Sequence, residues 1–226
     1  MTTTLADVPT FDFTLAGQWW SLPIVDEAAA DRAIRSIVVE TAGQADQLAN
    51  FRHLMREQLH RTVADARDAN AHHLYLAREI SPGLPLSGAL GVYWPLLDTL
   101  PSDVAVAPKL ARAFLKAALH VADSTGSATD EQELDPAGGA VLRRSYRTEF
   151  DPDVVEGVDT NRGEQPAIIY TFRTDYWMTS PVPGRFALFS FSSQLVDLET
   201  ELVKLFDAIV STVRWRPFPS TNGEPQ

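Results

Sequence analysis

The chain of 226 residues has the length of one large domain, and its 45% content of hydrophobic residues is typical of a folded protein and too high for a disordered one. It contains no cysteine, which excludes disulfides, thiolate nucleophiles and cysteine-ligated zinc. The formal net charge of −11 repels nucleic acid and anionic lipid, so we expect neither as a partner, whereas a basic partner is compatible with it.

The sequence does not predict a secretory signal or a membrane span. The first ten residues lack the positive charge and the apolar run of a secretory signal, and no apolar stretch is long enough to span a bilayer. We therefore expect a cytoplasmic protein that does not enter the membrane. We predict one domain over residues 10–216, an N-terminal tail at 1–9 and a disordered C-terminal tail at 217–226.

The N-terminal part is expected to hold one short strand and two helices. Residues 11–15 alternate apolar and polar side chains, which is typical of a half-buried strand. Asp26 is suited to cap a helix over about 27–41 that ends at Gly43. A longer helix over about 45–69 is predicted by an apolar stripe with steps of three and four residues: Leu48, Phe51, Met55, Leu59, Val63 and Ala66.

The middle of the chain predicts a hairpin followed by a helix. Strands are expected at 73–79 and 86–97, separated by the turn at 81–85. Pro108 suits the first turn of a helix that runs to about Val121. The acidic segment 123–139, rich in Ser, Thr, Gly and Pro, is interpreted as a long loop.

The last third predicts three strands and a helix. The strands are expected at 140–150, 166–176 and 185–192, with a hairpin turn at 181–184. The helix is expected over about 195–213, with Ser193 as its cap. Because most strands follow one another without an intervening helix, the pattern favours an antiparallel sheet and the α+β class.

This C-terminal segment also resembles a known group of proteins. Its parts are Val141-Leu142-Arg143-Arg144, Ile169-Tyr170-Thr171-Phe172, Pro183-Gly184, Phe189-Ser190-Phe191-Ser192 and Phe206-Asp207-Ala208-Ile209-Val210-Ser211. Together with Trp19-Trp20-Ser21-Leu22-Pro23, they resemble uncharacterised actinobacterial proteins similar to the PsbP-like superfamily, which is named for a photosystem II extrinsic subunit. The resemblance covers about residues 140–216, with a weaker match at 10–24.

The resemblance implies a fold and a kind of function. It implies a central antiparallel β-sheet sandwiched between helices, an α/β/α arrangement, with the helix at 45–69 as an extra long helix in the N-terminal half. The wider superfamily includes secretion-effector chaperones and a nuclear transport factor, which are mostly binding proteins. It therefore implies binding to another protein and offers no catalytic residue to transfer.

The sequence shows no motif for catalysis, metal or cofactor. The patterns GxSxG, HExxH, GxGxxG and GxxxxGK[ST] are all missing. His53, Glu57 and His60 share one side of the long helix, but that side faces water, where side chains rarely form metal sites. Asp151-Pro152-Asp153 is typical of a turn. We expect no catalytic residue, no metal and no cofactor.

Two arginines are candidate binding residues. On a strand, Arg143 and Arg147 point to the same face, where they are suited to hold a carboxylate or a phosphate. The alternative is that both pair with acidic side chains of the sheet.

Three tryptophans are the other candidates. Trp19 and Trp20 are adjacent, so on a strand they point to opposite faces, and at least one is expected to be partly exposed. Trp177 lies beside a proline-rich turn. Exposed indoles often mark a partner surface, although a helix or a loop can also cover them.

These observations predict a non-enzymatic binding or adaptor protein, chaperone-like in its relation to a protein or peptide partner. Trp19, Trp20 and Trp177 would supply affinity, and Arg143 and Arg147 would orient an acidic group. The alternative is a small-ligand protein or enzyme with a pocket between sheet and helices. A homodimer is a further prediction.

Overall fold

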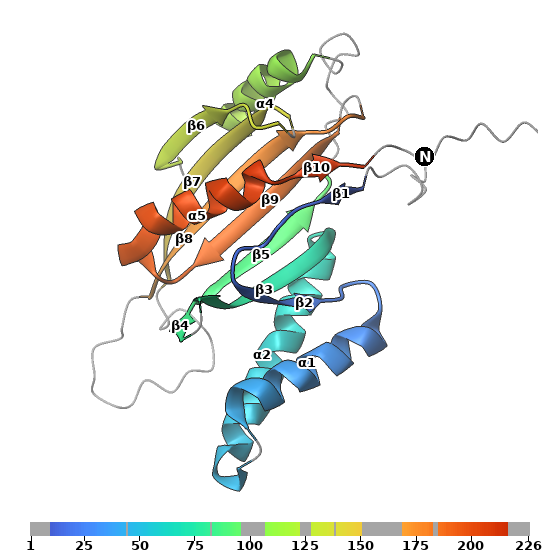
Figure 1. The fold of residues 1–226 in the computed structure, drawn as a ribbon, viewed down its shortest axis with the longest axis vertical. Coiled ribbons are helices and arrows are strands. Elements are labelled where there is room, and N and C mark those ends of the chain that lie inside the picture. The colour runs from blue at the N-terminus through green and yellow to red at the C-terminus, as the bar shows by residue number, and fades with distance from the viewer. Residues whose placement is uncertain are drawn as a thin grey trace, which may run out of the picture.

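A computed structural model describes most of the chain (Figure 1). The described residues are 10–43, 45–81, 83–95, 107–122, 128–137, 139–150, 169–182 and 185–216. The predicted tails at 1–9 and 217–226, the turn at Asp151-Pro152-Asp153 and the dipeptide Pro183-Gly184 lie outside these residues.

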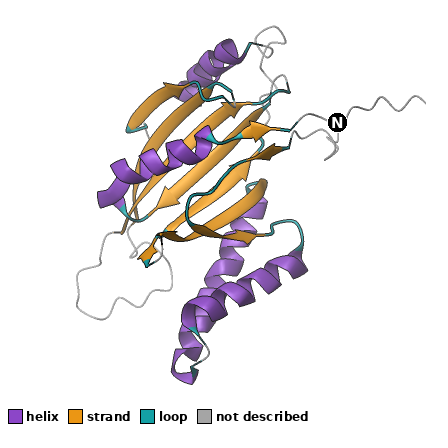
Figure 2. Cartoon of the chain, viewed as in Figure 1, coloured by secondary structure: helices purple, strands orange, loops and turns teal. Residues whose placement is uncertain are grey.

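One large antiparallel sheet forms the centre of the molecule (Figure 2). Its strands are β2 (Gln18–Leu22), β3 (Ala71–Ser81), β4 (Leu84–Pro85), β5 (Gly88–Tyr93), β6 (Asp130–Leu134), β7 (Val141–Phe150), β8 (Ile169–Thr179) and β9 (Phe186–Ser193). Their order is β2-β3-β5-β9-β8-β7-β6, and the short β4 pairs with β3. Every pairing between described strands is antiparallel, which confirms the predicted α+β class.

Four α-helices lie within the described residues: α1 (Glu27–Ala42), α2 (Ala49–Asp68), α4 (Pro108–Ala122) and α5 (Glu199–Ser211). Asp26 caps α1 as predicted, because its Oδ1 accepts a hydrogen bond of 3.0 Å from the amide of Ala29. Gly43 ends α1 with a φ of 63°, a conformation that glycine adopts without strain. No helix in the described part of the chain is long and apolar enough to cross a membrane.

The helices cover both faces of the sheet, as predicted. On one face, Phe206 of α5 packs against Phe172 and Phe191 of the sheet, with ring centroids 6.2 and 4.3 Å apart. The other face carries two separate clusters. Leu74 of β3 lies under α1 and α2, and Leu142 of β7 lies under α4.

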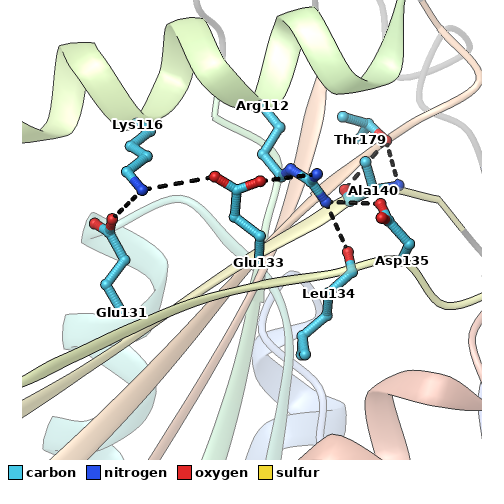
Figure 3. Close-up of polar contacts among 8 residues, drawn as sticks. All are labelled: Arg112, Lys116, Glu131, Glu133, Leu134, Asp135, Ala140 and Thr179. Carbon is cyan, nitrogen blue, oxygen red and sulfur yellow. Dashed lines mark hydrogen bonds and ion pairs between the residues drawn. The ribbon is translucent and has the colours of Figure 1, made fainter.

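Strand β6 corrects the prediction of a loop over 123–139. Its sequence, Asp130-Glu131-Gln132-Glu133-Leu134, has low strand propensity, so the sequence alone did not indicate it. Basic side chains of α4 hold it in place from one face (Figure 3). Arg112 Nη2 lies 2.9 Å from Glu133 Oε2, and Lys116 Nζ lies 2.9 Å from Glu131 Oε1. Tertiary ion pairs therefore stabilise this edge strand.

The two ends of the described chain pair with each other, which the sequence did not predict. The predicted strand at 11–15 is reduced to β1 (Phe11–Asp12), and the predicted helix at 195–213 ends earlier and is followed by β10 (Arg214–Trp215). These two strands form a separate antiparallel pair. Because α5 begins at Glu199 after a 3-10 turn (Val196–Leu198), the predicted cap at Ser193 is wrong.

Candidate functional site

The helical hairpin α1–α2 extends past the edge of the sheet (Figure 1). The second half of α2 is the buried part: Leu59, Val63 and Ala66 belong to the cluster that α1, α2, β2 and β3 share, and of the first half Met55 packs against that cluster while half-buried. The predicted apolar stripe is present with the expected spacing, but its residues are not equally buried. The first half of α2 lies where the sheet no longer supports it.

Large apolar side chains are exposed on this first half and on the 3-10 turn that precedes it (Asp46–Leu48). The exposed fractions are 51% for Phe51, 56% for Leu54 and 39% for Leu48, whereas Met55 is half-buried. We name these four residues the α2 stripe. Steps of three and four residues place them on one side of the helix. A contiguous exposed apolar surface of this kind marks an interaction site more often than a single exposed leucine does.

A shallow depression of about 530 Å³ follows the α2 stripe. Its apolar lining comes from three stripe residues and the adjacent buried leucine: Phe51, Leu54, Met55 and Leu59. Glu57 and Arg61 lie at its polar side. The surface is thus apolar along the helix and charged at its rim, which is the composition of a protein interface.

Arg52 fixes the turn that carries the α2 stripe. Its Nη1 donates hydrogen bonds to the carbonyl oxygens of Gly43, at 3.2 Å, and Ala45, at 2.7 Å. These carbonyls follow the end of α1, so the guanidinium joins the start of α2 to the end of α1. The hairpin tip is therefore braced before any partner binds.

The charges around the α2 stripe are mainly positive. Arg56 and Arg61 are exposed and make no ion pair within the described residues. Among the residues that line the depression, Glu57 is the acidic one, and its Oε1 lies 3.4 Å from Nε2 of His53. Residues 49–61 carry three arginines and one glutamate, in a chain whose formal net charge is −11.

A second concave surface lies between β7 and α5, with a volume of about 380 Å³. Arg143 lies on its wall and donates to Asp207, at 2.7 Å, and to Asp130, at 2.8 Å. The hydroxyl of Tyr176 also donates to Asp207, at 2.8 Å. Burial, together with the negative charge of Asp207, raises the pKa of Tyr176 far above its ordinary value.

Arg147 lies on the same face as Arg143, as the strand pattern predicted. Its Nη2 and Nε each lie 2.6 Å from Oε2 of Glu199 on α5. Both arginines are therefore paired with acidic side chains of the protein itself. An acidic ligand that binds these two arginines has to displace Asp130, Asp207 or Glu199 from them.

The structure separates Trp19 and Trp20 onto opposite faces of the sheet. Trp19 packs at the border of the core under α5, and its Nε1 donates to the carbonyl of Ala16 at 2.8 Å. Trp20 packs beside the cluster under α1, and its Nε1 donates to Glu40 Oε2 at 3.0 Å. This hydrogen bond holds the pKa of Glu40 below its ordinary value. Both indoles are half-buried.

Trp177 lies on the face that α4 covers. It is half-buried beside Leu115 and Leu142, and its Nε1 is buried with no hydrogen-bond partner among the described residues. The structure thus brings Arg143 and Arg147 together but keeps the three predicted tryptophans apart. Their role in binding stays a prediction.

A buried carboxylate that the sequence did not single out lies on the same face as Trp177. Asp175 accepts a hydrogen bond of 2.7 Å from Ser190, and Arg173 Nη2 lies 3.2 Å from it. Burial raises the pKa of Asp175, while Arg173 and Ser190 oppose that shift. Its hydrogen bonds are satisfied within the sheet, which indicates a structural role.

Within the described residues, no group of three or more His, Asp and Glu side chains is arranged to hold a metal ion. His53 and His60 face water, as predicted, and each lies near a different carboxylate, on Glu57 and Asp31. The two imidazoles therefore do not converge.

The exposure of the α2 stripe was the main feature that the sequence left unpredicted. One signal was present: Leu54 falls outside the regular series that contains Phe51, Met55 and Leu59. An apolar residue there widens the apolar surface beyond what one buried helix face needs. Which part of that surface is covered depends on where the sheet ends.

Comparisons with known proteins do not identify a family for this chain. No family model and no curated protein matches the chain. A similar solved structure is the solution structure of cyanobacterial PsbP from Synechocystis sp. PCC 6803, at 13% sequence identity and a TM-score of 0.34. The match covers 65% of this chain and 75% of that one. Membership in the PsbP-like superfamily stays a prediction.

Proposed function

We propose that the protein is a binding or adaptor protein that engages another polypeptide through the α2 stripe. The observation that carries this proposal is the exposure of Phe51 and Leu54, each more than half exposed on a helix that is otherwise folded and braced. Leaving these side chains in water forfeits the hydrophobic free energy of their burial, about 1 to 2 kcal/mol each. A partner that covers them recovers it.

The shape of this surface fits a polypeptide better than a small molecule. The depression beside the α2 stripe is shallow and open, whereas small-ligand sites enclose most of their ligand. A second helix or an extended segment that lies along α2 would bury the whole row from Leu48 to Leu59. That is the helix-in-groove mode of recognition.

The groove between β7 and α5 supports the small-ligand alternative less well. Its two arginines, Arg143 and Arg147, are already paired with Asp130, Asp207 and Glu199, which leaves Lys204 as the cation of its lining without an ion pair among the described residues. A ligand gains little by replacing one carboxylate with another.

A photo-crosslinking amino acid at position 54 tests the proposal. In cells that make the protein naturally, we expect ultraviolet light to give one crosslinked adduct of defined mass. Phe51→Ser in the same chain should remove it. The adduct's partner, purified, should then bind the wild-type chain in solution and lose at least about tenfold in affinity for Phe51→Ser, the effect of losing one well-buried contact residue.

Leu110 provides a matched control because it is 58% exposed, compared with 56% for Leu54, and lies on α4. The same crosslinker at position 110 should not give the adduct. An adduct from both positions, or one that survives Phe51→Ser, contradicts the proposal. An adduct between two copies of the chain would instead support the predicted homodimer.

Binding through Trp19, Trp20, Trp177, Arg143 and Arg147 is a separate proposal with its own test. Trp19→Ala and Trp20→Ala should weaken capture of the same partner in a pull-down. If both variants capture it as the wild type does, those indoles are not part of the site.

A further inference from the structure

The charge of the α2 stripe's surroundings restricts which polypeptide can dock there. The first thirteen residues of α2, 49–61, carry three arginines and one glutamate, so their net charge is +2 before their two histidines are counted. Arg56 and Arg61 have no ion pair within the described residues, and Glu57 lies beside His53. The rest of the chain is strongly acidic.

We infer that the partner segment at the α2 stripe is an amphipathic helix whose apolar side is flanked by acidic residues. This inference rests on the proposed function and names the chemistry of its partner. The row from Leu48 to Leu59 spans about 16 Å of helix axis, the length of three helical turns. An occupant of that length presents apolar residues at i, i+3, i+4 and i+7 to the stripe.

Arg61 is the residue that would bind the acidic flank of the partner helix. It follows Leu54 by seven positions and therefore borders the apolar row on the same side of the helix. The groove beside the row includes Arg61 in its lining. A carboxylate on the partner helix would meet an exposed guanidinium for which no ion pair is found among the described residues, unlike Arg143 or Arg147, although Glu57 lines the same groove one turn away.

A second copy of the chain fits this charge pattern less well. Two copies of α2 would bring like-charged arginine surfaces together, and each body also carries a formal net charge of −11. An anionic membrane meets the same acidic body and is repelled by it. An acidic helix from another protein places its negative charge at the contact itself, which is net positive, and presents far less charge to the acidic body than a membrane surface does.

Two synthetic helical peptides test the inference. Both present leucine at i, i+3, i+4 and i+7, and one carries glutamate on its flanks where the other carries lysine. At about 50 mM salt we expect the glutamate peptide to bind at least about tenfold more tightly, and the difference to shrink at about 500 mM salt because ions screen exposed charges. Phe51→Ser should abolish binding of either peptide.

Arg61→Glu should reverse the preference between the two peptides. Lys109→Glu is the matched control because it makes the same change of charge on α4, where Lys109 is exposed. It should leave the preference unchanged. If Arg61→Glu and Lys109→Glu act alike, net charge and not the α2 surface decides binding, and the inference fails.

Other outcomes separate this inference from the proposed function. If both peptides bind equally and Phe51→Ser loses that binding, the docking surface is supported and the inference of an acidic partner is overturned. No binding of either peptide overturns the inference, while the crosslink from position 54 still decides the proposed function. Stronger binding to vesicles of anionic lipid than to the glutamate peptide, lost in Phe51→Ser, would show that a membrane surface occupies the stripe.

Discussion

The guanidinium of Arg112 on α4 donates a hydrogen bond of 2.9 Å to the carbonyl oxygen of Leu134, the last residue of the edge strand β6. The same guanidinium contacts Glu133 and Asp135, at 2.9 and 2.7 Å (Figure 3). One buried arginine therefore joins a helix to the outermost strand of the sheet. The bond to Leu134 occupies one backbone carbonyl of the edge strand, and charged side chains along an edge oppose pairing with another chain.

Arg112→Ala should destabilise the fold by about 2 kcal/mol, because it removes a buried charged donor and leaves the two carboxylates without it. Urea unfolding followed by circular dichroism measures the loss. Lys109→Ala, an exposed change on the same helix, should stay within about 0.5 kcal/mol of the wild type. Equal effects of the two variants would show that β6 does not depend on Arg112.

The two halves of α2 should respond differently to truncation. Leu59→Ala removes a side chain that is 8% exposed, so we expect a loss of about 2 to 3 kcal/mol. Phe51→Ser changes a side chain that is half exposed and should cost less than about 1 kcal/mol. Urea unfolding of both variants checks this. A large loss for Phe51→Ser would mean that the α2 stripe stabilises the fold and is not reserved for a partner.

Gly91 lies directly under the ring of Tyr93. A Cβ atom at position 91 would come within 2.7 Å of both Cε2 and the hydroxyl of Tyr93, which is closer than real contacts allow. Gly91→Ala should therefore cost about 1 to 3 kcal/mol by overpacking. In the Tyr93→Ala background the same change should cost much less, and thermal unfolding of the four variants of this double-mutant cycle measures the difference. Additive effects would contradict this contact.

His72 and His73 should make stability depend on pH. Burial lowers the pKa of both imidazoles below the ordinary 6.5, and for His72 the nearby His73 adds to this. The unfolded chain therefore takes up protons first as the pH falls below about 6.5, and stability decreases from there through the folded pKa values. The raised pKa of Asp175 acts in the opposite direction, because the folded chain takes up a proton there before the unfolded chain does as the pH falls toward 3.8.

Urea unfolding between about pH 5 and pH 7 measures this dependence. We expect the decrease in the upper part of that range to be smaller in His73→Gln, since glutamine does not titrate. An unchanged slope in that variant would show that His73 is not buried as the structure has it.

The hydrogen bond from Trp20 to Glu40 should be visible in a titration. It is the largest cause of the lowered pKa of Glu40, ahead of the hydrogen bond from Ser36. In Trp20→Phe, we expect the pKa of Glu40 to rise toward its ordinary value, as followed by the carboxyl carbon shift in NMR. Ser36→Ala is the comparison variant and should give a smaller rise. No change in Trp20→Phe would contradict the contact.

Periodicity in the sequence predicted most of the regular structure. The two ends of α1, at Asp26 and Gly43, were predicted correctly because helix capping and left-handed backbone are local properties of the chain. The strands β8 and β9 followed from apolar residues that share one face of each strand, and the lack of helices between most strands predicted an antiparallel sheet. The shared face of Arg143 and Arg147 followed from the two-residue period of a strand.

Only the tertiary structure decided which apolar surface is covered. Strand β6 forms although its sequence is acidic, because Arg112 and Lys116 come from a helix elsewhere in the chain. Phe51 and Leu59 are both apolar members of one helix, yet one is exposed and the other buried, since the sheet ends between them. Burial depends on what lies opposite a side chain in space, and local sequence does not contain that information.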